Sequence, residues 1–289
     1  MARSRRKGHR ASFKELVDLW VDLFSQHNLL TYASAIAFQA LVALVALLLL
    51  AIATLGEIGR QDVWDQQIGP QIEPKVLPAV FSGIDATVQK VFTSSSGGLI
   101  AFAAVLAIWE MSGVVRAIMG AVACVYDTED DRSWKARFPV SIAIGIVLTG
   151  SIVGAILLGT AARTAVHGGW SVPFAILRWL VAVVLIGIGF GLLVRYAPVE
   201  RRTTRWASAG ATVVVVAWVI EALIFAEYLR SVADYKTAVG SLLGVYFLTT
   251  FLYVAAIILL VGIELDEQLR KDLQGKEERG ILEIVRDVV

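Results

Sequence analysis

The sequence contains a single cysteine, Cys124, and only three histidines, His9, His27 and His167. One cysteine excludes an intrachain disulfide bond, and three scattered histidines do not supply the closely spaced ligands of a zinc site. Charged residues are also scarce, because Asp, Glu, Lys and Arg together make up 18% of the chain. We therefore expect no disulfide, no bound metal and no cofactor.

The motifs of nucleotide-driven or hydrolytic chemistry are missing as well. The sequence has no GxxxxGK[ST] phosphate-binding loop, no HExxH zinc motif, no GxSxG nucleophile motif and no paired cysteine spacing. Its 26 Lys and Arg residues nearly balance its 25 Asp and Glu residues, so no overall positive charge attracts nucleic acid. We expect a protein that is not an enzyme and has no nucleic-acid partner.

Apolar residues make up 57% of the chain, and the mean hydropathy is +0.71. This composition excludes a water-soluble fold. A bilayer core about 30 Å thick requires roughly 20 apolar residues in a helix, because only a helix pairs all of its backbone amides internally. Six segments meet this requirement and predict an all-α polytopic membrane protein. The predicted spans are residues 32–55, 97–122, 140–162, 174–194, 207–229 and 242–263.

Lys and Arg are unevenly distributed between the two sides of these spans, with eighteen on one side and six on the other. Short basic loops remain cytoplasmic, so we expect both termini in the cytoplasm. Residues 1–31 then form a cytoplasmic segment with an amphipathic interfacial helix, and residues 32–264 form the membrane domain. An outer amphipathic helix is expected over about residues 75–93, and residues 265–289 form a charged cytoplasmic tail.

Several ionisable residues lie within the predicted spans. Such a group at membrane depth costs about 2.5 to 3.5 kcal/mol on insertion scales, so it normally faces a partner or a wet cavity. We predict that the following residues line a substrate or ion pathway with an inner and an outer polar layer. The inner layer holds Glu110 and Arg116 with Arg195 nearby, the outer layer holds Arg178, Glu221 and Glu227, and Gln39 lies in the first span.

A purely structural role is the alternative for these residues. Arg116 and Glu227 can extend to the interfaces, while Glu110, Glu221 and Gln39 can form neutral contacts between helices. Glu110 and Arg116 are six positions apart, a rotation of about 240°, so they pair only if the helix breaks between them.

Glycines four residues apart occur in the third and fourth predicted spans and at the start of the sixth. Small residues allow helices to approach closely, so these pairs predict packing contacts and are compatible with a homo-oligomer. They are Gly150 with Gly154, Gly187 with Gly191, and Gly240 with Gly244.

A series of short motifs occurs in a specific order between about Leu30 and Glu267. They comprise Tyr32 to Phe38, Trp109, Ser112, Gly113 and Arg116, then Arg195, Tyr196 and Pro198, and finally Tyr235, Gly240 and Glu264. In order and spacing they resemble the YihY/BrkB family of bacterial inner-membrane proteins. Three positions depart from the family pattern: Gln39 stands where tyrosine is usual, Ala46 where proline is common, and Ala123 where asparagine is expected.

The resemblance implies a six-span protein of the bacterial inner membrane, in a family linked to virulence and to export across the envelope. The family has also carried the label ribonuclease BN. A hydrolytic nuclease requires zinc ligands that this sequence does not assemble.

We expect a transport protein that moves a lipid-like or small organic substrate through a polar intramembrane cleft, with membrane lipids as its partners. The alternative is a non-transporting scaffold for envelope proteins, which predicts dry and fully packed space between the helices. A membrane-bound ribonuclease is the third hypothesis, and the missing metal ligands argue against it.

Overall fold

The computed structural model describes residues 22, 24–94, 97–126, 134–165, 181, 184, 209–231 and 237–273. All regular secondary structure in these residues is helical. Five of the described helices are long and apolar enough to cross a membrane. They are α2 (Leu29–Glu57), α5 (Gly97–Val125), α6 (Trp134–Ala165), α8 (Ala209–Ser231) and α9 (Ala238–Leu273). The chain is therefore an all-α polytopic membrane protein.

Five of the six predicted spans coincide with these helices, with boundaries shifted by a few residues. The fourth predicted span, residues 174–194, lies outside the described residues except for Val181 and Val184. The helix α9 continues ten residues beyond the predicted end of the last span at Ile263. Its charged end is also packed rather than solvated, because Glu267 and Gln268 are buried.

The helix α2 stops where a glycine allows the chain to turn back. Gly59 has a φ of +68°, in the left-handed region that favours glycine. Its amide donates to the Gly56 carbonyl, and the Arg60 amide donates to the Leu55 carbonyl. These two bonds form a Schellman motif, which satisfies carbonyl groups at the end of the helix.

The helix α2 lies at the centre of the bundle and packs against α4, α5, α6 and α9. Two hydrophobic clusters follow its length. One joins its second half to α5 and α6, and small residues such as Ala43, Ala46, Ala103 and Ala107 let α2 and α5 approach closely. The other joins its first half to α5, α6 and the second half of α9.

Glycines also allow close contacts between the other helices. A Cβ added at Gly145 on α6 would lie 3.1 Å from the Ser112 amide nitrogen on α5. On α8, a Cβ added at Gly210 would overlap the Gly262 carbonyl oxygen of α9. Gly150 behaves differently, since the described residues leave open space around it. Of the glycines in the four-residue pairs, Gly150 therefore makes no close contact with the described residues, and Gly187 and Gly191 lie outside them.

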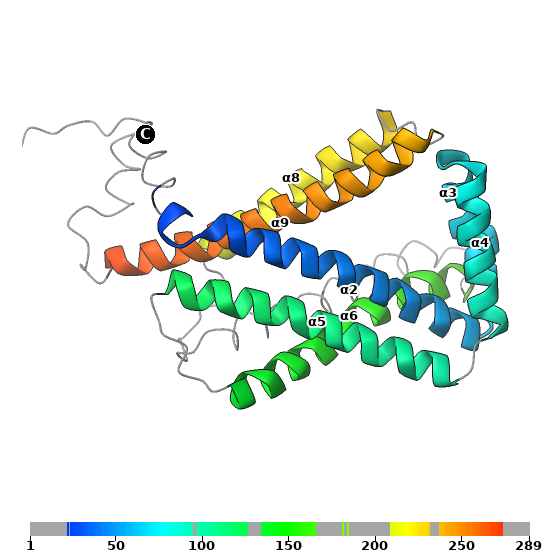
Figure 1. Cartoon of the computed structure of the whole chain (residues 1–289), viewed down its shortest axis with the longest axis horizontal. Coiled ribbons are helices and arrows are strands. Elements are labelled where there is room, and N and C mark those ends of the chain that lie inside the picture. Colours follow the sequence, from blue (N-terminus) through cyan, green and yellow to red (C-terminus); the bar gives the residue numbers. More distant parts are fainter. Residues whose placement is uncertain are drawn as a thin grey trace, which may run out of the picture.

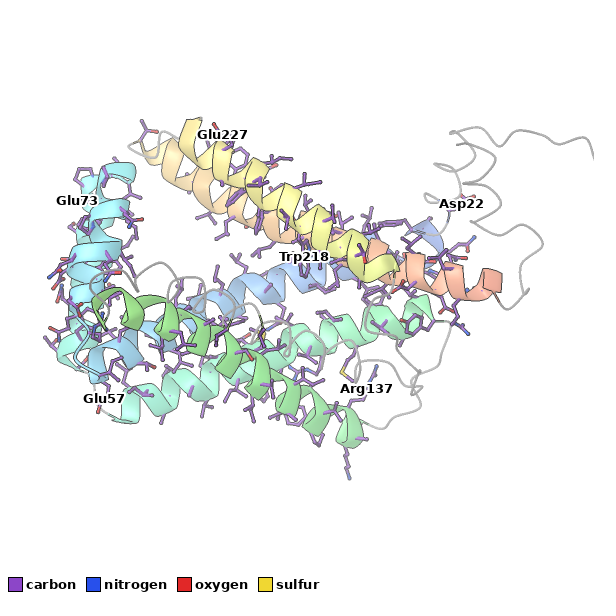
Figure 2. The ribbon with its side chains drawn as sticks, turned by 180° about the vertical axis from the view of Figure 1, so that it is seen from behind. Asp22, Glu57, Glu73, Arg137, Trp218 and Glu227 are labelled. Carbon is purple, nitrogen blue, oxygen red and sulfur yellow. The ribbon has the colours of Figure 1, made fainter. Side chains whose placement is uncertain are left out.

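Among the described helices, the α8–α9 pair contacts the rest of the bundle through the second half of α9. Figure 1 shows α8 and α9 beside the start of α2 and diverging from it toward α3 and α4, and Figure 2 shows the same divergence from behind. The buried residues that α9 contributes to the shared core, Ala256, Leu259 and Leu260, all lie in its second half. In its first half Leu242 and Tyr246 are exposed.

A set of shorter helices covers the end of the bundle where α2 finishes, which we call the α4 end. It consists of the π-helix η1 (Trp64–Ile68), α3 (Gly69–Ile72), the 3₁₀ helix η2 (Glu73–Lys75) and α4 (Pro78–Thr93). The Trp64 indole donates a 2.7 Å hydrogen bond to Asp85, and Trp64 packs with Val88 and Phe92. The opposite end of the bundle, where α5 finishes at Val125, we call the α5 end.

Candidate functional site

The first candidate polar contact joins α2 and α5 near the middle of both helices. The Gln39 side-chain amide donates to the Glu110 carboxylate over 2.6 Å and lies 3.3 Å from the Glu110 backbone carbonyl. Gly113 provides the space, because a Cβ at this position would lie 2.5 Å from the Gln39 amide nitrogen. The predicted residues Gln39 and Glu110 are thus a matched pair, and this contact needs no additional ligand.

Arg116 occupies a different interface, between α5 and α6. Its guanidinium donates to the Ser112 hydroxyl over 2.7 Å and lies 3.5 Å from the Ser141 hydroxyl. It also lies over the rings of Trp109 and Phe138, at 5.8 and 5.6 Å from their centroids. Cation–π contacts of this kind stabilise a guanidinium by about 0.5 to 2 kcal/mol, depending on its desolvation.

The single inner polar layer predicted from the sequence therefore divides into two sites. The helix α5 is continuous from Gly97 to Val125, so Glu110 and Arg116 keep their different directions. Glu110 contacts Gln39 of α2, whereas Arg116 contacts Ser141 of α6. Arg195, the third residue placed near this layer, lies outside the described residues.

Glu221 lies on the face of α8 that meets α9. Trp218, three positions earlier, donates to the Ala255 carbonyl of α9, and the ring of Phe225, four positions later, stacks on Phe251 of α9. Both carboxylate oxygens of Glu221 are inaccessible to solvent and have no hydrogen-bond partner among the described residues. Figure 2 marks this level of α8 by Trp218. Glu221 is thus an acid at membrane depth that makes no polar contact with the described residues.

The remaining predicted pathway residues do not extend this site. Glu227 is exposed and lies toward the α4 end of α8, as Figure 2 shows. Arg178, which the sequence offered as a partner for Glu221 or Glu227, lies outside the described residues. Of the predicted outer polar layer, the described structure therefore contains Glu221 and Glu227.

The sequence did not reveal a buried polar cluster at the α5 end. His27 Nδ1 lies 3.0 Å from the Glu264 carboxylate, and the Gln268 amide donates to the other Glu264 oxygen over 2.9 Å. Glu264 is fully buried, and the Cys124 thiol donates to the His27 carbonyl. The spacing of Glu264 and Gln268, four positions apart on one helix face, was the only signal in the sequence, and it does not identify the histidine.

Two other residues of the family motif, Tyr32 and Gly240, make contacts within the described structure. Tyr32 on α2 packs against α5, with its ring 3.4 Å from where a Cβ of Gly120 would lie. The Gly240 amide donates a 3.0 Å hydrogen bond to the Thr237 hydroxyl, which caps the start of α9. Arg195, Tyr196, Pro198 and Tyr235 lie outside the described residues.

Within the described part of the chain, no group of three or more His, Cys, Asp or Glu residues is close enough together to hold a metal ion. The His27 cluster contains one histidine and one carboxylate in contact, with an amide as the third member. A carboxamide is a weak zinc ligand, so this cluster is better suited to hydrogen bonding than to metal binding.

Comparison with known proteins gives one family and one relative. The family model described as virulence factor BrkB matches residues 21–281. A protein of Bacillus subtilis (strain 168) named ribonuclease-like protein YfkH is 27% identical over 209 residues, covering 69% of this chain and 76% of the relative. No solved structure matches the chain.

Proposed function

This chain belongs to the virulence factor BrkB family, and from that premise we propose that it is a transport protein of the bacterial inner membrane. It has six spans and both termini in the cytoplasm, in accordance with the distribution of Lys and Arg. Its cargo is a lipid-like or small organic molecule, which moves through a polar cleft between the helices. The α5 end then faces the cytoplasm and the α4 end faces outward.

The proposal is carried by Glu221. Its carboxylate oxygens are buried without a hydrogen-bond partner among the described residues. An acid in this state at membrane depth is costly, and such residues typically mark the routes of protons, ions or substrates. A proton or a polar group of the cargo supplies the missing partner when the site is occupied.

The arrangement of the helices supports a lipid-like cargo. The α8–α9 pair diverges from α2 toward the α4 end (Figure 1). On α8 many apolar side chains are exposed, including Val219, Leu223 and Ile224. Apolar side chains of this kind can pack against acyl chains, which supports a lipid-like cargo.

Reconstitution in liposomes tests the proposal directly. The purified full chain is assayed with fluorescent phospholipids and small organic solutes, and with a pH-sensitive dye inside the vesicles. We expect Glu221→Gln to reduce translocation by about ten- to a hundredfold, because a charge-assisted hydrogen bond contributes about 1.5 to 3 kcal/mol. Glu57→Gln is the matched control, since Glu57 is exposed at the end of α2. Translocation no faster than in protein-free vesicles for every cargo would overturn the proposal.

A scaffold for envelope proteins is the second candidate function. The Gln39–Glu110 pair favours it, because these two polar side chains bond to each other within the protein. In that case Glu110→Gln and Glu221→Gln both leave permeability unchanged in the liposome assay, and the unpaired acid at Glu221 has no transport role.

Ribonuclease activity is not part of the proposal, although the relative from Bacillus subtilis carries a ribonuclease-like name. The described residues contain no cluster of potential metal ligands. We expect the purified protein to leave RNA intact with and without a chelator. Cleavage that a chelator abolishes would contradict this expectation.

A further inference from the structure

The charge of Arg116 is not neutralised by any carboxylate in the described part of the chain. One guanidinium nitrogen, Nη1, contacts the hydroxyls of Ser112 and Ser141, and the two rings of Trp109 and Phe138 cover the group. These partners are all neutral. The other guanidinium nitrogens make no hydrogen bond to the described residues, and a guanidinium offers five N–H donors in a planar fork. The site therefore has positive charge and donors available for an anion.

Arg116 lies at a depth that a lipid headgroup can reach. A helix of 29 residues, such as α5, is about 44 Å long and exceeds a 30 Å hydrocarbon core by about 7 Å at each end. The Cα of Arg116 is nine residues, or about 13 Å, before the end of α5 at Val125. With the axis of α5 centred in the bilayer and parallel to its normal, this Cα lies roughly 7 Å below the hydrocarbon boundary, a distance that an arginine side chain can span.

Two further cations lie near the same boundary. Lys135 and Arg137 are in the first turns of α6, one to two turns before Ser141, and Lys135 is exposed. Figure 2 shows Arg137 on the side of the bundle away from Glu57, toward the α5 end. Basic pockets between helices at the cytoplasmic membrane surface bind the phosphates of anionic lipids. The acidic segment 127–131 of the connection between α5 and α6 lies outside the described residues.

The aromatic residues indicate which source of phosphate the site suits. Trp109 is 52% exposed, and its ring contacts both Arg116 and Phe138. An acyl chain or glycerol backbone can pack on the exposed indole while its phosphate contacts the guanidinium. A free phosphate ion gains nothing from this apolar surface.

We propose that Arg116, Ser112 and Ser141 form a binding site for a phosphate group at the α5–α6 seam, occupied by the headgroup of an anionic phospholipid. The guanidinium forms charge-assisted hydrogen bonds with the phosphate oxygens, and the serine hydroxyls orient the guanidinium. The site is separate from Glu221 and does not depend on transport, since a scaffold can hold the same lipid.

Native mass spectrometry of the purified full chain in detergent tests the site. Phosphatidylglycerol and phosphatidylcholine with identical acyl chains are added in separate titrations, and inorganic phosphate in a third. We expect the wild-type chain to retain phosphatidylglycerol in preference to phosphatidylcholine. We expect Arg116→Gln to reduce this retention by about tenfold or more, because a hydrogen bond to a charged group contributes about 1.5 to 3 kcal/mol.

Two further variants separate binding from folding and from general loss of charge. Arg116→Lys keeps the positive charge and should retain part of the lipid binding, although it loses the planar fork. Arg60→Gln removes one positive charge at the α4 end, where Arg60 pairs with Asp62, and should retain the lipid fully. The melting temperature of each variant shows whether it is folded.

The outcomes distinguish a lipid from soluble phosphate as the occupant. Two of them would overturn the proposed site. Arg116-dependent retention of phosphatidylglycerol supports the lipid, and Arg116-dependent binding of inorganic phosphate alone supports the same phosphate site with a soluble occupant. Equal retention of phosphatidylglycerol by wild type and folded Arg116→Gln overturns the proposal. Wild-type protein that binds neither anion overturns it as well, whether or not the liposome assay detects transport.

Discussion

The Gln39 amide on α2 donates to the Glu110 carboxylate on α5 across 2.6 Å, in the middle of the two most extensively packed helices of the bundle. The two residues are 71 positions apart in the chain. The Gln39 amide thus joins α2 to the Glu110 carboxylate of α5. The contact adds a polar link to the apolar packing between these two helices.

This pairing predicts a specific pattern in a double-mutant cycle. Gln39→Leu and Glu110→Leu should each lower the free energy of unfolding, because each leaves one buried polar group without its partner. The double variant should recover about 0.6 to 1.7 kcal/mol relative to the sum of the two single effects, the range measured for hydrogen bonds between membrane helices. Thermal or denaturant unfolding in detergent measures these values. Strictly additive losses would show that the two side chains do not interact.

The Glu221 side chain should lower the free energy of unfolding. Because both of its carboxylate oxygens are buried without a partner among the described residues, Glu221→Leu removes a desolvated polar group from the α8–α9 interface. We expect the free energy of unfolding to rise by about 1 to 3 kcal/mol, while translocation in liposomes is lost. Glu57→Leu, at an exposed position, should change stability by less than about 0.5 kcal/mol. A lower stability of Glu221→Leu would mean that the acid has a partner.

The close approach of α8 and α9 predicts a strong effect of one methyl group. Gly210→Ala places a Cβ against the Gly262 carbonyl oxygen, and a backbone atom cannot move aside as a flexible side chain can. We expect a loss of about 1 to 3 kcal/mol in the free energy of unfolding.

The control for this prediction is Gly150→Ala on α6, where the described residues leave open space. It should be neutral or slightly stabilising, because alanine is the better helix former. Melting temperatures of the two variants in the same detergent compare them directly. Equal melting temperatures would show that α8 and α9 are farther apart than the structure indicates.

The Trp64–Asp85 hydrogen bond should determine how firmly α4 is held at its end of the bundle. Asp85→Ala leaves the buried Trp64 indole N–H without its acceptor, which costs about 1 to 3 kcal/mol. Hydrogen–deuterium exchange should become faster in α4 and remain unchanged in α5. Asp65→Ala is the control, because Asp65 accepts only an exposed hydrogen bond from Gln89. Unchanged exchange in α4 after Asp85→Ala would contradict the prediction.

The candidate site was predictable in part. The intramembrane acids Glu110 and Glu221 stand out in the sequence because any charge in an apolar run of helix length is unusual. Which residues contact Glu110 and Arg116 was not predictable. Gln39 and Ser141 are ordinary polar residues in other helices, and nothing in their local sequence indicates which acid or base they face. The split of Glu110 and Arg116 between two interfaces likewise depends on the neighbours of α5.

The glycines also show that local sequence does not identify which residues meet between helices. A four-residue spacing suggested contacts at Gly150, whereas the structure places close approaches at Gly145, Gly210 and Gly262. The spacing identifies a helix face on which a partner can come close, but the partner's own side chains decide whether it does. At Gly210 the facing residue is also a glycine, and this complementarity becomes visible only when both helices are in place.

The sequence by itself determined the all-α membrane architecture and the positions of the described spans. Hydropathy and helix length are local properties, and they decide whether a segment can cross the apolar core of a bilayer. The tertiary structure alone decided which polar groups meet. His27 and Glu264 are 237 positions apart, and their contact follows from the rotation and tilt of α9 against the start of α2. Those angles are set by side-chain packing between helices, and no single segment of sequence contains that information.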